Sequence, residues 1–246
     1  MVVIENLFIF TRQQYDVKHL YLFGLFFSLP FFCFSQGEWN NWVFGKHAEI
    51  NFTSGAPVPI STVSSLFNEF GAGLTVSDSI GNILFYGENS IYKYEYIYNR
   101  NNVRMPNGNL YYGNEINNLN PLFVVPNLTN DSLYYIFSLV NPYPGPGPGG
   151  LYYSVLDMRL DGGLGDINPS QSFIRIYNSS NARNVMTGTR HHNNKDAWIV
   201  LHKLTGSNEY LSYHISSAGI DTIPVVSQSF VNFDTSSNFS INTLST

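Results

Sequence analysis

The chain has 246 residues, of which 12% are charged and 16% aromatic, a balance opposite to that of disordered proteins. Its formal net charge of −5 excludes an ordinary nucleic-acid-binding protein, which would display a basic surface. Cys33 is the one cysteine, so an intrachain disulfide framework is excluded and the fold must depend on core packing and strand pairing.

The N-terminal part has the order of regions that is typical of a secretory signal peptide. Basic residues precede an apolar run at 20–34, and the small residues Cys33 and Ser35 occupy the −3 and −1 positions of a cleavage site before Gln36. The run is shorter than the ~20 apolar residues of a membrane span. Residues 1–35 are therefore predicted to be a signal peptide, with an uncleaved anchor as the alternative, and the mature chain is predicted to be exported without a membrane span.

Residues 36–246 consist of short apolar or alternating runs separated by polar turns, the pattern of an all-β domain. The clearest strands are 132–140 and 151–158. They are followed at 159–166 by a glycine-rich reversal, in which three glycines can adopt positive φ without steric cost. These are Gly162, Gly163 and Gly165.

An order of four strands recurs three times at a spacing of about 50 residues, which is typical of propeller blades. The predicted strands are 73–77, 83–87, 91–98 and 109–112; 121–125, 133–139, 151–158 and 173–177; 185–190, 197–202, 210–215 and 224–230. A partial unit at 41–60 precedes them. The fold class is therefore predicted to be a β-propeller-like array of four-stranded blades, similar to WD40 or kelch propellers and incomplete. A β-sandwich is the alternative.

Four histidines, His191, His192, His202 and His214, raise the question of a zinc site. Adjacent histidines on a strand point to opposite faces, and no Cys or Glu lies nearby at a ligand-like spacing. No metal site is therefore predicted, and His202 is expected to pack within a sheet.

Carboxylates were considered for calcium binding and for glycoside hydrolysis. Asp157, Asp161 and Asp166 lack the oxygen spacing and late Glu of an EF-hand, so turn chemistry is predicted, with a weak calcium site as the alternative. A glycosidase needs two carboxylates that face one sugar. The candidates are Glu69, Asp78, Glu88, Glu95, Glu115 and Asp196. Most are in predicted turns, and no nucleophile elbow or phosphate loop occurs, so no catalytic residue and no cofactor is predicted.

A tyrosine ladder is the candidate binding surface. Tyr92, Tyr94, Tyr96 and Tyr98 alternate along one predicted strand and share one face. Tyrosines have an apolar body and a polar tip, so an exposed ladder would suit contact with a protein or glycan. Packing between neighbouring strands is the alternative and is favoured, because aromatic residues pair well across strands.

Several stretches together resemble one family. They are WVFG at 42–45, NFTSGAP at 51–57, SDSIGNILFY at 77–86, MPNG at 105–108, YYIF at 134–137, GLYYSVLDMRLDGGLGD at 150–166, RHH at 190–192 and WIV at 198–200. They resemble the N-terminal propeller-like region of large secreted proteins of gliding Bacteroidota, which end in a gliding-motility-associated type IX secretion (type B) sorting domain. The resemblance implies an exported protein of the cell surface. It also leads us to expect a fragment that lacks the C-terminal part.

The function expected from the sequence is that of a non-enzymatic exported binding or scaffold module, at the cell surface or outside it, in adhesion or gliding motility. Its partner would be a protein or a glycan of the cell surface. The alternative is a secreted propeller-type hydrolase that acts on polysaccharide. An unclosed array would expose the last unit near residues 225–233, an apolar and nearly uncharged segment that is prone to pair with another chain.

Overall fold

The computed structural model describes residues 37–44, 48–60, 73–89, 95–110, 122–140, 149–178, 186–203 and 207–229. The chain divides into two units, Met1–Ser35 and Gln36–Thr246, and every element below belongs to the second. The predicted signal peptide lies outside the described residues. Within the described ranges, the chain forms strands and three short 3-10 helices, and none of its helices is long and apolar enough to cross a membrane.

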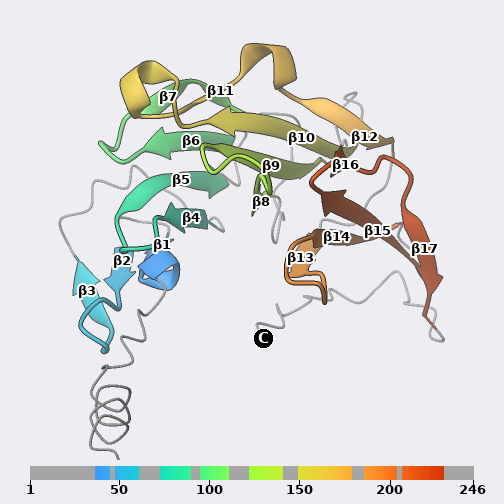
Figure 1. Ribbon diagram of the computed structural model, residues 1–246, viewed down its shortest axis with the longest axis horizontal. Coiled ribbons are helices and arrows are strands. Elements are labelled where there is room, and N and C mark those ends of the chain that lie inside the picture. Colours follow the sequence, from blue (N-terminus) through green and yellow to red (C-terminus); the bar gives the residue numbers. More distant parts are fainter. Residues whose placement is uncertain are drawn as a thin grey trace, which may run out of the picture. The chain divides into compact units, whose positions relative to one another are not determined.

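The strands form four antiparallel sheets that follow one another along the chain (Figure 1). The first contains β1 (Asn41–Phe44), β2 (Ala48–Asn51) and β3 (Val58–Ile60). The second contains β4 (Gly73–Ser77), β5 (Ile83–Asn89), β6 (Glu95–Asn99) and β7 (Arg104–Asn109). The third contains β8 (Leu122–Pro126), β9 (Leu133–Val140), β10 (Gly150–Asp157), β11 (Asp166–Ile167) and β12 (Ile174–Asn178). The fourth contains β13 (Met186–Arg190), β14 (Ala197–His202), β15 (Glu209–Ser216), β16 (Gly219–Ile220) and β17 (Val225–Gln228).

The all-β prediction is confirmed, and the repeated order of four strands is present in the second, third and fourth sheets. In each, the first three strands pair consecutively and a last strand, β7, β12 or β17, pairs with the third. The short β11 and β16 are additions beside β10 and β15. None of the four described sheets closes on itself.

One predicted strand begins too late: the last strand of the second sheet is β7, which starts at Arg104, whereas the prediction was 109–112, of which residues 111–112 lie outside the described residues. The reason is a tight reversal directly after β6. The side-chain oxygen of Asn99 accepts hydrogen bonds from the backbone N–H groups of Asn101 and Val103, at 3.0 and 3.2 Å. Asn102 adopts a φ of 62°, a conformation that asparagine tolerates better than most residues. The chain therefore turns back five residues earlier than the apolar pattern indicated.

In the second, third and fourth sheets, the same kind of turn connects the first two strands. A side-chain oxygen of Asp78, Asn127 or Asn193 accepts a hydrogen bond from the backbone N–H two residues further on, at 3.1, 2.9 and 2.9 Å respectively. Such turns replace the ladder hydrogen bonds that the reversing backbone loses. The glycine-rich reversal after β10 also forms as expected, with Gly162, Gly163 and Gly165 all at positive φ.

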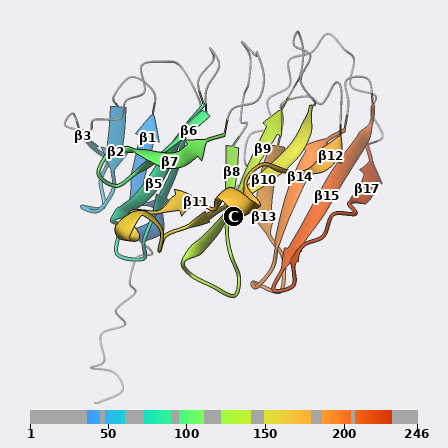
Figure 2. The same ribbon diagram turned by 90° about the horizontal axis from the view of Figure 1, so that it is seen from above.

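The hydrophobic core lies between successive sheets, because the two middle sheets bury both of their faces (Figure 2). On β5, Phe85 packs toward the third sheet, whereas the adjacent Tyr86 packs toward the first. On β9, Ile136 packs toward the second sheet and Phe137 toward the fourth. Side chains alternate along a strand, so two-sided burial explains why these strands read as nearly continuous apolar runs.

Gly188 tests the packing of the fourth sheet on the third. A Cβ atom added to Gly188 on β13 would lie 2.2 Å from the ring of Phe123 on β8. We expect Gly188→Ala to lower the free energy of unfolding by about 1–3 kcal/mol, because overpacking forces side chains out of their rotamers. In a Phe123→Leu background the same change should cost less. The measurement is the urea midpoint of each variant in a double-mutant cycle, with Thr187→Ala on the other face of β13 as the control. Additive costs would contradict the packing.

Candidate binding site on the fourth sheet

The fourth sheet has one face in the core and one face that no described sheet covers. Ile199 on β14 and Tyr213 on β15 are buried against the third sheet. The alternate residues lie on the opposite face, where Trp198 pairs with His214 and Val200 with Ser212. We call this face, which carries Trp198, Val200 and His202 of β14 and Tyr210, Ser212 and His214 of β15, the Trp198 face.

In the preceding sheets, the corresponding face packs on the next sheet and is apolar or aromatic. In the second sheet it carries the buried Phe85 and Ile97, and in the third it carries Phe137 paired with Tyr153. In the fourth sheet the corresponding face of β14 and β15 carries Trp198 and Val200 among histidine, serine and tyrosine side chains. The Asp196 and Asp221 carboxylates, which lie just outside these strands, flank its His214. The Trp198 face is thus much more polar than the faces that pack sheet on sheet.

Three half-buried rings gather at the turn end of this face. The ring centroid of Trp198 lies 4.7 Å from that of His214 and 5.8 Å from that of His191. His191 and His214 are 5.6 Å apart, and the exposed His192 lies beside His191. The rings come from β14, β15 and the turn between β13 and β14, so the register of the sheet brings them together.

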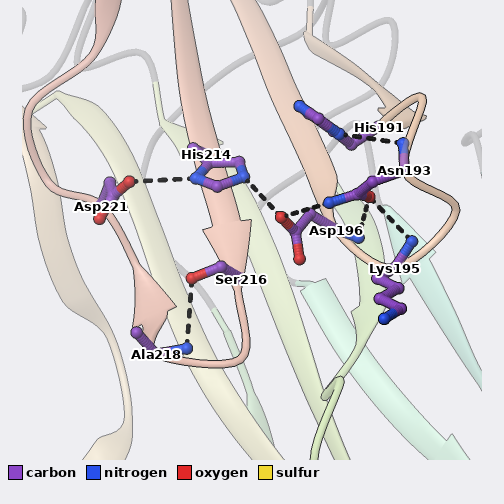
Figure 3. Close-up of polar contacts among 8 residues, drawn as sticks. All are labelled: His191, Asn193, Lys195, Asp196, His214, Ser216, Ala218 and Asp221. Carbon is purple, nitrogen blue, oxygen red and sulfur yellow. Dashed lines mark hydrogen bonds and ion pairs between the residues drawn. The ribbon is translucent and has the colours of Figure 1, made fainter.

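Two carboxylates flank His214 (Figure 3). Asp196 approaches its Nε2 atom at 3.1 Å, and Asp221, whose side chain is 63% exposed, approaches Nδ1 at 3.2 Å. A neutral imidazole has one N–H, whereas a protonated imidazole donates from both nitrogens. The two carboxylates therefore share one imidazole, each through a different ring nitrogen.

Asp196 is also held by the turn that precedes β14. The side-chain N–H of Asn193 donates to the same oxygen of Asp196 at 2.8 Å, and the side-chain oxygen of Asn193 accepts from the backbone N–H of Asp196. The hydrogen bond from Asn193 lowers the pKa of Asp196, His214 lowers this pKa further, and partial burial opposes both. Asp196 is therefore ionised at neutral pH.

His191 and His192 do not lie on a strand and do not point to opposite faces, contrary to the expectation from the sequence. Both follow β13 in a turn, where their rings lie 4.1 Å apart. Within the described ranges, however, no group of three His, Cys, Asp or Glu side chains is arranged to hold a metal ion. His202 is buried at the end of β14 and packs edge-on against Tyr210, with 5.1 Å between centroids.

The tyrosine ladder is described only in part, since Tyr92 and Tyr94 lie outside the described residues. Tyr98 is completely buried and stacks on Tyr86, with 5.2 Å between ring centroids. Tyr96 is half-buried beneath the guanidinium of Arg104, which lies 3.8 Å from its ring centroid. Tyr98 therefore packs between the first two sheets and presents no surface for a partner.

The acidic residues after β10 have structural partners. Asp157 forms an ion pair with Arg159 at 2.7 Å, and this hydrogen bond lowers the pKa of Asp157. Asp166 accepts hydrogen bonds from the backbone and side chain of Asn107, which tie this loop to β7. Asp161 lies in the turn helix η2 (Asp161–Gly163) at a φ of 49°. These contacts agree with structural roles for the three residues, in stabilising turns and in joining the loop to β7.

The other carboxylates that the sequence suggested for hydrolysis belong to other parts of the chain. Asp78 caps the turn between β4 and β5, while Glu88 and Glu95 belong to β5 and β6. Glu69 and Glu115 lie outside the described residues. Asp196 is the predicted carboxylate that directly precedes β14 and contacts His214.

The pairing of Trp198 with His214 was missed in the sequence because it depends on the register of β14 and β15. Residues 198 and 214 are remote in the chain, and only the hairpin places them opposite each other. Polar residues alternate with apolar ones along both strands, and this pattern was the signal in the sequence that one face of the hairpin is not in the core. No protein family, curated protein or solved structure was found to match the chain, so the site is interpreted from its own geometry.

The Asn193 hydrogen bond can be tested by titration. We expect Asn193→Ala to raise the pKa of Asp196 toward the ordinary Asp value of about 3.9, because the largest stabilising contact of the carboxylate is lost. The stability that Asp196 contributes is present above its ordinary pKa and is lost as the pH falls through its lower pKa in the folded chain. Carboxyl ¹³C NMR measures the shift. Ser216→Ala, which removes a hydrogen bond elsewhere in the sheet, is the control, and an equal shift in both variants would contradict the assignment.

Proposed function

We propose that this chain is an exported, non-enzymatic binding module and that it binds a glycan at the Trp198 face. The observation that carries the proposal is the tryptophan set among hydrogen-bonding groups, on a face that the preceding sheets use for apolar packing. Binding sites of this kind combine an aromatic surface with a few polar groups that fix orientation.

The chemistry of the cluster suits a pyranose ring. The indole of Trp198 offers a flat apolar surface against the C–H face of a sugar. The exposed Asp221 carboxylate next to His214 can accept hydrogen bonds from hydroxyl groups, and the exposed His192 next to His191 can donate or accept one. A protein partner would be expected to meet a more apolar centre, since charged residues are depleted there.

Binding is favoured over hydrolysis by the state of the carboxylates. A general acid in a glycosidase needs a raised pKa and a second carboxylate across the sugar. The pKa of Asp196 is lowered, and both Asp196 and Asp221 are engaged by the single imidazole of His214. Glu49, whose pKa is raised by burial, lies on β2 in the first sheet.

The proposed setting is a propeller-like array at the cell surface. The first strands of neighbouring sheets lie next to one another, β1 beside β4 and β8 beside both β4 and β13, as the inner strands of propeller blades do. The resemblance to secreted proteins of gliding Bacteroidota supports export and a role in adhesion or gliding. A glycan of the cell surface or of the substratum is a ligand that such a protein would meet.

Glycan binding can be tested with soluble oligosaccharides. Cellohexaose, laminarihexaose and chitohexaose are titrated into the protein and followed by calorimetry. We expect at least one to bind, and Trp198→Ala to weaken it at least tenfold, about 1.4 kcal/mol, because the stacking surface is removed. Trp42→Ala is the matched control, since Trp42 is an exposed tryptophan on the first sheet. An equal loss of affinity in both tryptophan variants would contradict the proposed site. Release of reducing sugar from an oligosaccharide, abolished by Asp196→Asn, would contradict the proposal of a non-enzymatic module.

Export can be tested by intact mass. We expect the chain recovered from the periplasm or medium of a Gram-negative host to begin at Gln36, because Cys33 and Ser35 occupy the cleavage positions. Ser35→Arg should block processing, since a bulky charged residue at −1 is not accepted, while Ser28→Arg at a position away from the cleavage site serves as the comparison for added charge. Retention of residues 20–34 in the exported protein would show that the leader is an anchor.

A further inference from the structure

The outer edge of the fourth sheet is uncovered along β17. Within the described residues, β17 pairs with β15 on one side and with no strand on the other. All four of its residues are exposed, Val225 and Val226 by 58% and 52%. A strand in this position presents unpaired backbone groups to solvent.

The hydrogen-bond pattern identifies which groups point outward. The Ser229 N–H donates to the carbonyl oxygen of Asn208 at 2.7 Å, directly beyond the last pair of the β15–β17 ladder. In an antiparallel pair, alternate residues bond to the same neighbour. Ser229, Ser227 and Val225 therefore bond toward β15, and the N–H and C=O groups of Val226 and Gln228 face the free edge.

The last strands of the other three sheets carry features that discourage pairing with a further strand. β3 contains Pro59, and β7 contains Arg104 and Pro106. β12 carries the exposed Arg175. Proline lacks the donor and charged residues are costly to cover, so these residues protect an edge. β17, with the sequence Val-Val-Ser-Gln, has neither proline nor charge.

We propose that two copies of this chain pair antiparallel through β17, about a twofold axis at Ser227. In this register Val226 of each copy lies opposite Gln228 of the other, and each such pair exchanges both backbone hydrogen bonds. Every outward-facing group of β17 is then satisfied by its equivalent, which is the self-complementarity that a twofold interface requires. The strand is uncharged, so its pairing with a second copy brings no like charges together.

The register also fixes how the two sheets face. Residues directly opposite in an antiparallel pair share a face of the sheet, and here Ser227 lies opposite its own equivalent. Ser227 pairs with Tyr210, and Val225 with Ser212, so both lie on the side of the Trp198 face. The twofold axis is therefore perpendicular to the plane of the sheet, and the Trp198 faces of both copies point the same way. The dimer does not depend on the proposed ligand.

The first test is a cysteine placed on the twofold axis. In a Cys33→Ala background, Ser227→Cys introduces the only thiol of the chain, and the two thiols meet in a non-hydrogen-bonded pair, where side chains approach closely. We expect a disulfide-linked dimer on a non-reducing gel after mild oxidation. Val225→Cys is the control, because in this register it lies opposite Ser229 and not its own equivalent. Equal cross-linking of the two variants, or none of Ser227→Cys, would overturn the proposal.

The second test removes the outward donor without disturbing the sheet. Val226→Pro deletes an N–H that faces the free edge, and it leaves the hydrogen bonds to β15 in place. By light scattering after size exclusion, we expect the parent chain and Val226→Thr to be dimers and Val226→Pro to be a monomer with an unchanged melting midpoint. A monomeric parent chain, or a dimeric Val226→Pro, would contradict the proposed pairing.

Discussion

Burial of both faces of the middle sheets is the constraint on which the rest of the structure depends. Because the chain has a single cysteine and so no intrachain disulfide, each sheet is held mainly by the apolar surface it shares with its neighbours, at about 1.5–3 kcal/mol for each large side chain buried. Adjacent residues such as Ile136 and Phe137 serve different neighbours. A substitution in a middle sheet therefore affects at least one interface whichever way its side chain points.

The Trp198 face belongs to a sheet of which only one face is buried against another described sheet. No other described sheet packs on this face, where β14 and β15 carry Trp198 beside Ser212 and His214 and where two carboxylates flank His214. Core packing accounts for Ile199 and Tyr213 on the other face and gives no reason for this polar set. A ligand does, because a bound sugar needs a flat apolar surface and hydrogen-bonding groups together. Core and candidate site therefore occupy the two faces of one hairpin.

Much of the fold could be predicted from the sequence, because two-sided burial and side-chain-capped turns leave strong local signals. The strands around Ile136 and Leu156, and the turns at Asp78 and Asn127, lie where the pattern placed them. β7 was misplaced because the Asn99 reversal is formed by a side chain and not by glycine or proline. The candidate site could not be predicted, since it depends on the register between β14 and β15. For Tyr98 of the tyrosine ladder, burial between the first two sheets agrees with the packing that the sequence favoured over an exposed surface.

The meander order has a consequence for how the chain folds. In the second, third and fourth sheets each strand pairs with strands close to it in sequence, and among the described residues the core clusters join sheets that are neighbours along the chain. Local contacts of this kind lower the entropy lost in closing loops, so a β-protein built this way folds faster than one with distant strand partners. Folding can begin in any sheet and spread to the next. The bonds from Asp166 to Asn107, which join the third sheet to the second, form only once both sheets are in place.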